Sequence, residues 1–349
     1  MRKPIIVVGS YNAGLFMKGP RLPGRGETVL GDQFLEGPGG KGSNQAIAAA
    51  KLGGDVRFIC CLGDDKYGED ARRLYREMGM DAQFVFEAKG IHSGIGFVLI
   101  DAEGNNAISV VLGANLRLRP EHIDRARDVI RSAGVLACQL EGPLDTFAYA
   151  LRTARELGVT TILDPAPAVP LSDEIYQNTD IITPNETVVE ILTGIRPETM
   201  RSAAKAGRLL LSRGIRTAIV KLGERGSLCV TANDERYVPA VRVEMLDATG
   251  AGDAFAGGLM TALAEGKPLM DAIAFATCVA AISVTKVGVV NALPTREEAD
   301  ALLAKVCPQP ELVACNTCQI QCTTAGCPHY GVGPTESDRV AAGPAGQEP

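Results

Sequence analysis

Short apolar, β-branched runs alternate with segments of helical periodicity along most of the chain, and this alternation constrains the fold most strongly. The segments between the runs, such as residues 120–134 and 143–158, start near a proline and end in glycine. Runs that are apolar throughout are typical of strands covered on both faces. The pattern therefore predicts an α/β fold with helices on both faces of a mostly parallel sheet. The predicted strands are residues 4–8, 56–61, 134–140, 160–164, 180–183 and 217–223.

Two stretches, residues 11–36 and 91–111, break this alternation. Within the second, GIGFVLIDAEGNNAISVVLG is typical of a hairpin that turns at a Gly-Asn pair. We expect both stretches to form a small sheet that projects from the main one. Ligands of a parallel sheet bind beyond the carboxyl ends of its strands, so we expect the functional loops at that edge.

Composition limits the classes of partner. The chain has 349 residues, of which 46% are hydrophobic, which suits one large domain with an appendage. The net charge of −6 gives no basic footprint, so we expect neither nucleic acid nor a membrane as a partner. The first apolar run is too short for a signal peptide, and residues 272–284 are too short to span a bilayer. We therefore expect a cytoplasmic protein.

The ten cysteines form two groups. One group lies among apolar residues, where we expect buried thiols in a reducing compartment. The other group lies between residues 307 and 327, in a segment (306–349) that has little apolar periodicity and is predicted to be disordered. The first group is Cys60, Cys61, Cys138, Cys229 and Cys278.

The cysteine spacing in the tail has two interpretations. Cys315, Cys318, Cys322 and Cys327, with His329 close by, are candidate ligands for zinc or an iron–sulfur centre. Only one pair has CxxC spacing, whereas zinc sites commonly join two such pairs across a longer loop. The alternative is a disordered tail with oxidisable thiols.

The segment LDATGAGDAF, residues 246–255, places Gly250, Ala251 and Gly252 directly before Asp253 and an apolar helical pattern. The start of a helix has backbone N–H groups without partners, and small residues let an anion approach them. Asp253 could simply cap this helix. The alternative is phosphoryl transfer, in which the amides stabilise the moving group and Asp253 accepts the proton of the attacking hydroxyl.

A second glycine cluster, EGPGGKGSNQAIAAAKLGG, precedes an alanine-rich helix predicted over residues 43–51. It does not fit a dinucleotide fingerprint, because the preceding segment is polar and the helix does not follow the first strand. It does not fit a P-loop either, because glycine follows Lys41. The cluster instead predicts a loop that brings backbone, Lys41 and Asn44 against a polyhydroxylated ligand.

Five motifs occur in order: GGKGSNQA, DPAPA, DIITPNET, LGERG and DATGAGDAF. Together they resemble the ribokinase-like carbohydrate kinases of the PfkB family, and the resemblance extends from about residue 4 to 305. It implies a three-layer α/β/α core with a small β-sheet lid over about residues 11–36 and 91–111. It also implies ATP as the donor, Mg²⁺ as cofactor and a sugar hydroxyl as the acceptor. We further expect a homodimer that forms through the lid.

The resemblance assigns roles by position. Asp253 is implied as the catalytic base and Gly250, Ala251 and Gly252 as its anion hole. The implied sugar contacts are Asn12, Gly40, Lys41, Asn44 and Glu141, and the implied nucleotide region holds Asn185, Lys221, Gly223 and Gly226. Asp247 and the backbone of Thr249 match a monovalent-cation loop for K⁺, whose second half is residues 284–292. Taken singly, these residues also fit structural roles, as turn residues, solvated carboxylates or strand-end charges.

Three departures from the family pattern affect the predicted chemistry. Gly14 replaces an aspartate that binds sugar hydroxyls, and Val188 replaces the glutamate of an N-x-x-E motif that organises magnesium, for which Glu186 or Glu190 could substitute. Ala292 replaces a serine of the cation loop. The main hypothesis is a kinase for the hydroxymethyl group of a pentose-like sugar. The alternatives are a nucleoside or deoxyribose kinase, and a catalytically weak sugar-binding or regulatory protein.

Overall fold

The computed structural model describes residues 3–306, 313–314 and 321–322. Its large sheet is parallel from β11 to β5, and β12 and β13 extend it as antiparallel strands. The predicted mostly parallel sheet is confirmed, with a strand in each of the six predicted runs. In spatial order the strands are β14 (Val313–Ala314), β15 (Gln321–Cys322), β13 (Glu235–Val238), β12 (Ser227–Thr231), β11 (Thr217–Lys221), β10 (Ile181–Ile182), β9 (Thr160–Leu163), β8 (Val135–Cys138), β1 (Ile5–Val8), β4 (Val56–Gly63) and β5 (Val85–Ala88).

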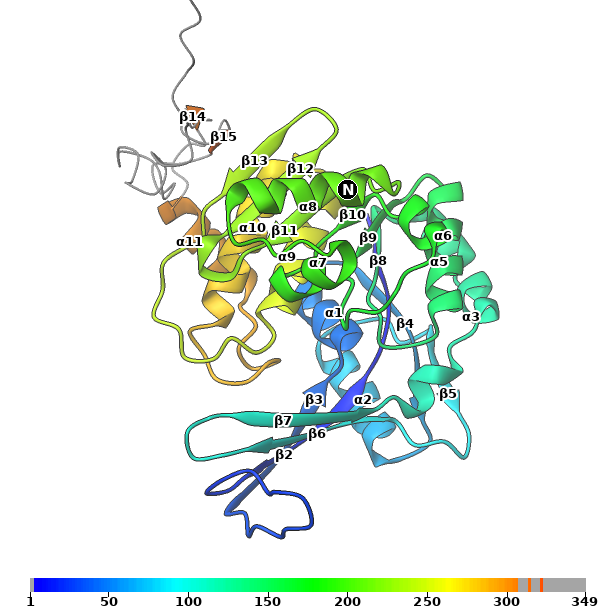
Figure 1. The fold of residues 1–349 in the computed structure, drawn as a ribbon. Helices are drawn as coiled ribbons and strands as arrows, with labels where there is room; N and C mark the ends of the chain where they lie inside the picture. Colours follow the sequence, from blue (N-terminus) through cyan, green and yellow to red (C-terminus); the bar gives the residue numbers. More distant parts are fainter. Residues whose placement is uncertain (1–2, 307–312, 315–320, 323–349) are drawn as a thin grey trace, which may run out of the picture.

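Helices cover both faces of the large sheet (Figure 1). The helix predicted over residues 120–134 is divided at Ala126 into two short helices. One layer contains α1 (Lys41–Lys51), α2 (Lys66–Glu77), α9 (Ala251–Ala264), α10 (Leu269–Ser283) and α11 (Arg296–Val306). The other contains α3 (Pro120–Arg125), α4 (Arg127–Ser132), α5 (Leu144–Glu156), α6 (Asp173–Gln177), α7 (Glu186–Thr193) and α8 (Met200–Ser212).

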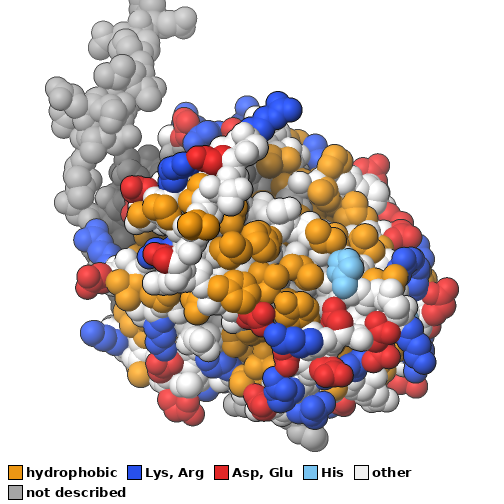
Figure 2. Space-filling model, turned by 90° about the horizontal axis from the view of Figure 1, so that it is seen from below, with side chains coloured by type: hydrophobic (Ala, Val, Ile, Leu, Met, Phe, Trp, Pro, Cys, Tyr) orange, Lys and Arg blue, Asp and Glu red, His pale blue; other side chains and the backbone are white. Residues whose placement is uncertain are grey.

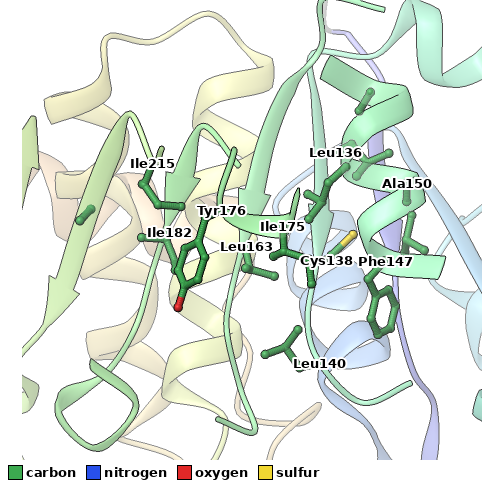
Figure 3. Packing of buried hydrophobic residues seen from close by; sticks show 14 of the residues in the cluster. Leu136, Cys138, Leu140, Phe147, Ala150, Leu163, Ile175, Tyr176, Ile182 and Ile215 are labelled. Atoms are coloured by element: carbon green, nitrogen blue, oxygen red, sulfur yellow. The ribbon is translucent and has the colours of Figure 1, made fainter. Parts of the chain in front are cut away.

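Successive side chains of each strand point to opposite faces of the sheet, so each strand contributes to the core on both faces. In β1, Ile5 and Val7 pack with α1 and α9, whereas Ile6 and Val8 pack on the opposite face. Figure 3 shows part of the second layer, where side chains of β8 lie against α5. Because both faces are covered, strands of this sheet are apolar throughout, as the sequence pattern predicts.

The second sheet is small and projects from the core (Figure 1). Its strand order is β3 (Gln33–Gly39), β2 (Asn12–Lys18), β6 (Gly94–Ile100) and β7 (Asn106–Val111). The predicted hairpin is formed by β6 and β7, and its turn is held by Asp101, whose side chain accepts from the Asn105 backbone N–H at 2.8 Å. β2 and β6 pair in parallel, so the predicted small sheet is confirmed with mixed strand directions.

The two helices that carry the glycine-rich motifs, α1 and α9, pack unusually closely. A Cβ atom on Gly257 of α9 would lie 2.4 Å from the Cβ atom of Ala48 in α1 and 3.0 Å from the Ala49 nitrogen. Only glycine permits this approach. The contact brings the N-terminal halves of the two helices together, which positions the site described below.

Several large apolar side chains of the small sheet are exposed. Leu35 is 64% exposed and Ile108 62%, on the face of the sheet that also carries Asn12. Figure 2, seen from below the view of Figure 1, shows apolar side chains gathered in the middle of the face in view, with charged residues around them. The expected homodimer through this sheet stays a prediction.

The remaining expectations concern the cysteines, the membrane and the tail. The five cysteines expected to be buried are buried. No helix among the described residues is both long enough and apolar enough to cross a bilayer. Cys315, Cys318 and Cys327 lie outside the described residues, and Cys322 belongs to the two-residue strand β15, so the metal centre of the tail stays a prediction.

Candidate active site

Helix α9 begins with a geometry that exposes backbone amides. Gly250 has φ 79° and ψ 0°, and a Cβ atom there would lie 2.8 Å from Val289 Cγ1. Glycine is therefore required for both conformation and space. Among the described residues, no acceptor contacts the amides of Gly252 and Asp253. The predicted anion hole thus has free donors at a helix N-terminus.

The carboxylate of Asp253 does not cap its own helix. Its Oδ2 accepts from Asn44 Nδ2 at 2.9 Å and its Oδ1 from Gln45 Nε2 at 3.1 Å, and both donors belong to α1. Asp253 is 5% exposed. Burial raises its pKa and nearby Asp164 adds to the rise, whereas Lys41 and the two amides only partly oppose it. A buried carboxylate with a raised pKa is suited to accept a proton.

The predicted sugar contacts lie together around Glu141, just beyond β8. Glu141 Oε2 accepts from Asn12 Nδ2 at 3.2 Å, from the Lys41 backbone N–H at 2.9 Å and from the Ser10 hydroxyl. Gly40 has φ 88°, and a Cβ atom there would lie 2.6 Å from the Asn12 nitrogen. The glycine loop therefore packs directly on β2.

Lys41 and Asn44 connect this group to Asp253. Burial disfavours the charged form of Lys41, but Asp253, Asp164 and Glu141 outweigh it and raise the pKa of the ammonium group. Lys41 therefore stays positive among three carboxylates. The Oδ1 atom of Asn44 is buried and has no hydrogen-bond partner among the described residues. It is available to accept a hydrogen bond from a hydroxyl.

Of the predicted nucleotide residues, Lys221 at the end of β11 lies near the start of α9. Lys221 Nζ is 3.2 Å from Asp164 Oδ1, and a Cβ atom on Gly252 would lie 3.4 Å from that ammonium group. Lys221 is therefore beside the start of α9. Gly223 and Gly226 both have positive φ, at 57° and 84°.

Asn185, one of the predicted nucleotide residues, is the N-cap of α7. Its Oδ1 accepts from the Val188 backbone N–H at 2.8 Å and so caps α7. The start of α7 lies beside the predicted nucleotide residue Gly223, because a Cβ atom on Gly223 would lie 3.8 Å from Glu186 Oε2.

Asp247 joins the two halves of the predicted cation loop. Its Oδ1 accepts from the Thr249 backbone N–H at 2.9 Å and its Oδ2 from the Gly288 backbone N–H at 3.0 Å. Partial burial alone would raise the pKa of Asp247, but these hydrogen bonds outweigh burial and lower it. The carboxylate therefore stays charged where residues 246–249 meet residues 284–288. The potassium site itself stays a prediction.

Comparison with known proteins agrees with this geometry. The model of the pfkB family of carbohydrate kinases matches residues 2–296. The chain belongs to this family. It is 39% identical over 298 residues to a ribokinase of Haemophilus influenzae, covering 85% of this chain and 97% of that protein. It is 35% identical over 301 residues to a deoxyribokinase of Salmonella typhi, covering 86% and 98%. A ribokinase of Arabidopsis thaliana, solved with ribose and ATP, superposes with a TM-score of 0.82 at 30% identity, covering 87% and 99%.

In this carbohydrate kinase, Gly14, the first departure from the family pattern, lies against an aromatic side chain that the sequence did not indicate. Gly14 is not in the left-handed conformation, so its backbone would accept another residue. However, a Cβ atom there would lie 2.7 Å from Cε2 and 3.0 Å from Cζ of Phe16. Phe16 is two residues further along β2, on the same face. An aromatic edge therefore lies where the carboxylate of an aspartate would begin.

The second departure, Val188, lies in a part of α7 that packs into the core, and its side chain is buried there. A glutamate at this position would place a carboxylate among apolar side chains. Glu186 contacts Arg225 and borders Gly223, whereas Glu190 is 3.9 Å from Arg196. Of the two expected substitutes, Glu186 is the one beside the predicted nucleotide loop.

Sequence reasoning missed four polar residues of the candidate site. Gln45 contacts Asp253, Asp164 contacts Lys221 and Ser10 contacts Glu141. Asn115 Nδ2 donates to Asn12 Oδ1 at 2.9 Å. Gln45 and Asp164 fall inside the recognised motifs GGKGSNQA and DPAPA, so a signal was present. Nothing local in the sequence indicates that these two side chains meet.

Proposed function

We propose that this carbohydrate kinase transfers the γ-phosphoryl group of ATP to a hydroxymethyl group of a pentose-like sugar. The observation that carries the proposal is the position of Asp253, a buried carboxylate held by α1 at the start of a helix with free amides. Base and anion-binding groups are thereby adjacent, as transfer to a hydroxyl requires.

In the proposed reaction, the oxygen of the sugar hydroxyl attacks the γ-phosphorus while Asp253 accepts the proton of that hydroxyl. The bond between that phosphorus and the oxygen bridging it to the β-phosphorus breaks, and ADP leaves. The amides of Gly252 and Asp253 and the ammonium group of Lys221 lie where negative charge would develop on the transferred group. Asn12, Asn44 and Glu141 supply polar atoms for the remaining sugar hydroxyls.

We also propose that Mg²⁺ acts with the nucleotide and that Glu186 is the side chain of α7 that helps to hold it. When bound, the ion neutralises phosphate charge during transfer. Glu186 fits because its carboxylate borders Gly223 in the nucleotide loop. Arg225 contacts the same carboxylate and would share it.

Glu186→Gln should raise the magnesium concentration needed for half-maximal activity by several-fold, because the amide removes a negative ligand. Glu190→Gln is the matched control, since Glu190 is on the same helix and pairs with Arg196. A magnesium titration of kcat checks this. Identical titrations for both variants and the native protein would contradict the role of Glu186.

A second acceptor class is favoured by Phe16. A site that hydrogen-bonds a hydroxyl strongly rejects analogues without it, because its polar groups are left unpaired. Here the aromatic edge over Gly14 replaces that polar group. We therefore propose that 2-deoxyribose or a nucleoside competes well with ribose as acceptor.

An assay of ADP release should give similar kcat/KM values for ribose and 2-deoxyribose, within about tenfold. Gly14→Asp combined with Phe16→Ala, which makes room for the carboxylate, should raise the ratio of ribose to 2-deoxyribose by about 10- to 100-fold, the value of one charge-assisted hydrogen bond. Phe16→Ala alone is the control, and its ratio of kcat/KM for ribose to that for 2-deoxyribose should stay close to the native ratio.

A high ribose preference in the native protein, unchanged in the folded double variant, would contradict the role of Phe16. Absence of ADP release with every pentose and nucleoside would instead favour the alternative of a sugar-binding or regulatory protein.

We propose, finally, that two copies associate through the small sheet. Leu35 and Ile108 are the most exposed apolar side chains of its strands, and covering them would remove apolar area from water. Leu35→Lys with Ile108→Lys should sediment as a monomer at concentrations where the native protein sediments as a dimer. A native monomer at all concentrations would contradict the proposal.

A further inference from the structure

We propose that Gln45 is a positioning residue, which holds the base Asp253 in place by bridging it to the ion pair of Asp164 and Lys221. The inference rests on the proposed function, because it assumes that Asp253 is the base. It concerns a side chain with no role in the preceding mechanism, and it links the sugar side of the site to the nucleotide side.

The bridge is a single amide group. Gln45 Nε2 donates to Asp164 Oδ2 at 2.9 Å and to Asp253 Oδ1 at 3.1 Å. A primary amide nitrogen has two hydrogens, so each carboxylate receives one. Gln45 is 1% exposed, and water does not replace these bonds easily. The amide therefore separates two like charges that would otherwise repel each other in a buried place.

A third hydrogen bond fixes the direction of the amide. Gln139 Nε2 donates to Gln45 Oε1 at 2.7 Å, and Gln139 is fully buried on the strand side of α1. Ionised carboxylates only accept hydrogen bonds. Turning the Gln45 amide over would place its oxygen against two anions and its nitrogen against a donor. The orientation with both donors toward the carboxylates is thus the stable one.

The bridge continues to the phosphoryl side. Asp164 Oδ1 is 3.2 Å from Lys221 Nζ, and that ammonium group lies beside Gly252 in the anion hole. Contacts therefore run from Lys221 through Asp164 and Gln45 to Asp253. A displacement of either end would disturb the distance between base and transferred group.

The bridge has a defined effect on pH dependence. The charged groups around Asp253 are Lys41 from α1, Lys221 from β11, and Asp164 and Glu141 from the loops after β9 and β8. The Gln45 hydrogen bond favours the anion of Asp253, whereas the charge of Asp164 disfavours it. Loss of the amide should raise the pKa of Asp253. Since the base must be ionised, kcat falls as pH drops through that pKa, so the acid limb should move to higher pH.

The test compares pH profiles of kcat with saturating ATP and the native protein's best acceptor. Gln45→Met keeps the length of the side chain and removes both donors. Its acid limb should move up by about one pH unit, and its plateau kcat should fall by about tenfold. KM for the sugar should stay within about threefold, because Gln45 contacts the base and not the sugar.

A second substitution distinguishes loss of the hydrogen-bond bridge from a general disturbance of the site. Adding Asp164→Asn to Gln45→Met removes the unshielded charge, so the acid limb should return toward lower pH. Thr261→Val is the matched control, because Thr261 is buried on α9 and, among the described residues, its hydroxyl donates to the Gly257 carbonyl of the same helix. It should leave the acid limb unchanged.

The outcomes are distinct. An unchanged acid limb and kcat in folded Gln45→Met would overturn the bridge, as would a limb that stays raised after Asp164→Asn is added. If Gln45→Met does not fold, Gln45→Asn tests the same point, because its amide is one methylene shorter and cannot reach both carboxylates. Its acid limb should shift in the same direction. A native protein without kinase activity on any acceptor would instead refute the proposed function.

Discussion

The close contact between α1 and α9 is the constraint on which the site depends. Gly257 allows α9 to approach Ala48 so closely that the side chains of Asn44 and Gln45, on the same α1, reach Asp253. A larger residue at this crossing would separate the two glycine-rich motifs, which are about 200 residues apart in the chain. The helix packing therefore determines where Asp253, the proposed base, lies and which groups hold it.

Electrostatic balance is the second requirement of the site. Three carboxylates, Asp253, Asp164 and Glu141, share a small volume with the ammonium groups of Lys41 and Lys221. Removing charges from water is costly unless each is paired or hydrogen-bonded. The amides of α1 and the two lysines provide those partners. Asp253 still keeps a raised pKa, which a proton acceptor can use and a merely structural aspartate would not need.

Much of the fold could be predicted because its signals are local. Apolar runs and helical periodicity identified the strands of the parallel sheet, and the Gly-Asn pair identified the β6–β7 hairpin. The polar contacts of the site could not be predicted in the same way. Gln45 meets Asp164 only after the chain has folded, and the edge of Phe16 over Gly14 depends on a side-chain rotamer. Val188 looked like a missing ligand, but its position in the core is set by the packing of α7.

The most direct test of the central claim is the kcat of Asp253→Asn, measured with saturating ATP and the best acceptor. Asparagine keeps the size of the side chain but cannot accept the proton. The account predicts a loss of at least about 100-fold in kcat, with the melting temperature and circular dichroism of a folded protein. A folded variant that turns over at nearly the native rate would contradict the assignment of Asp253 as the base.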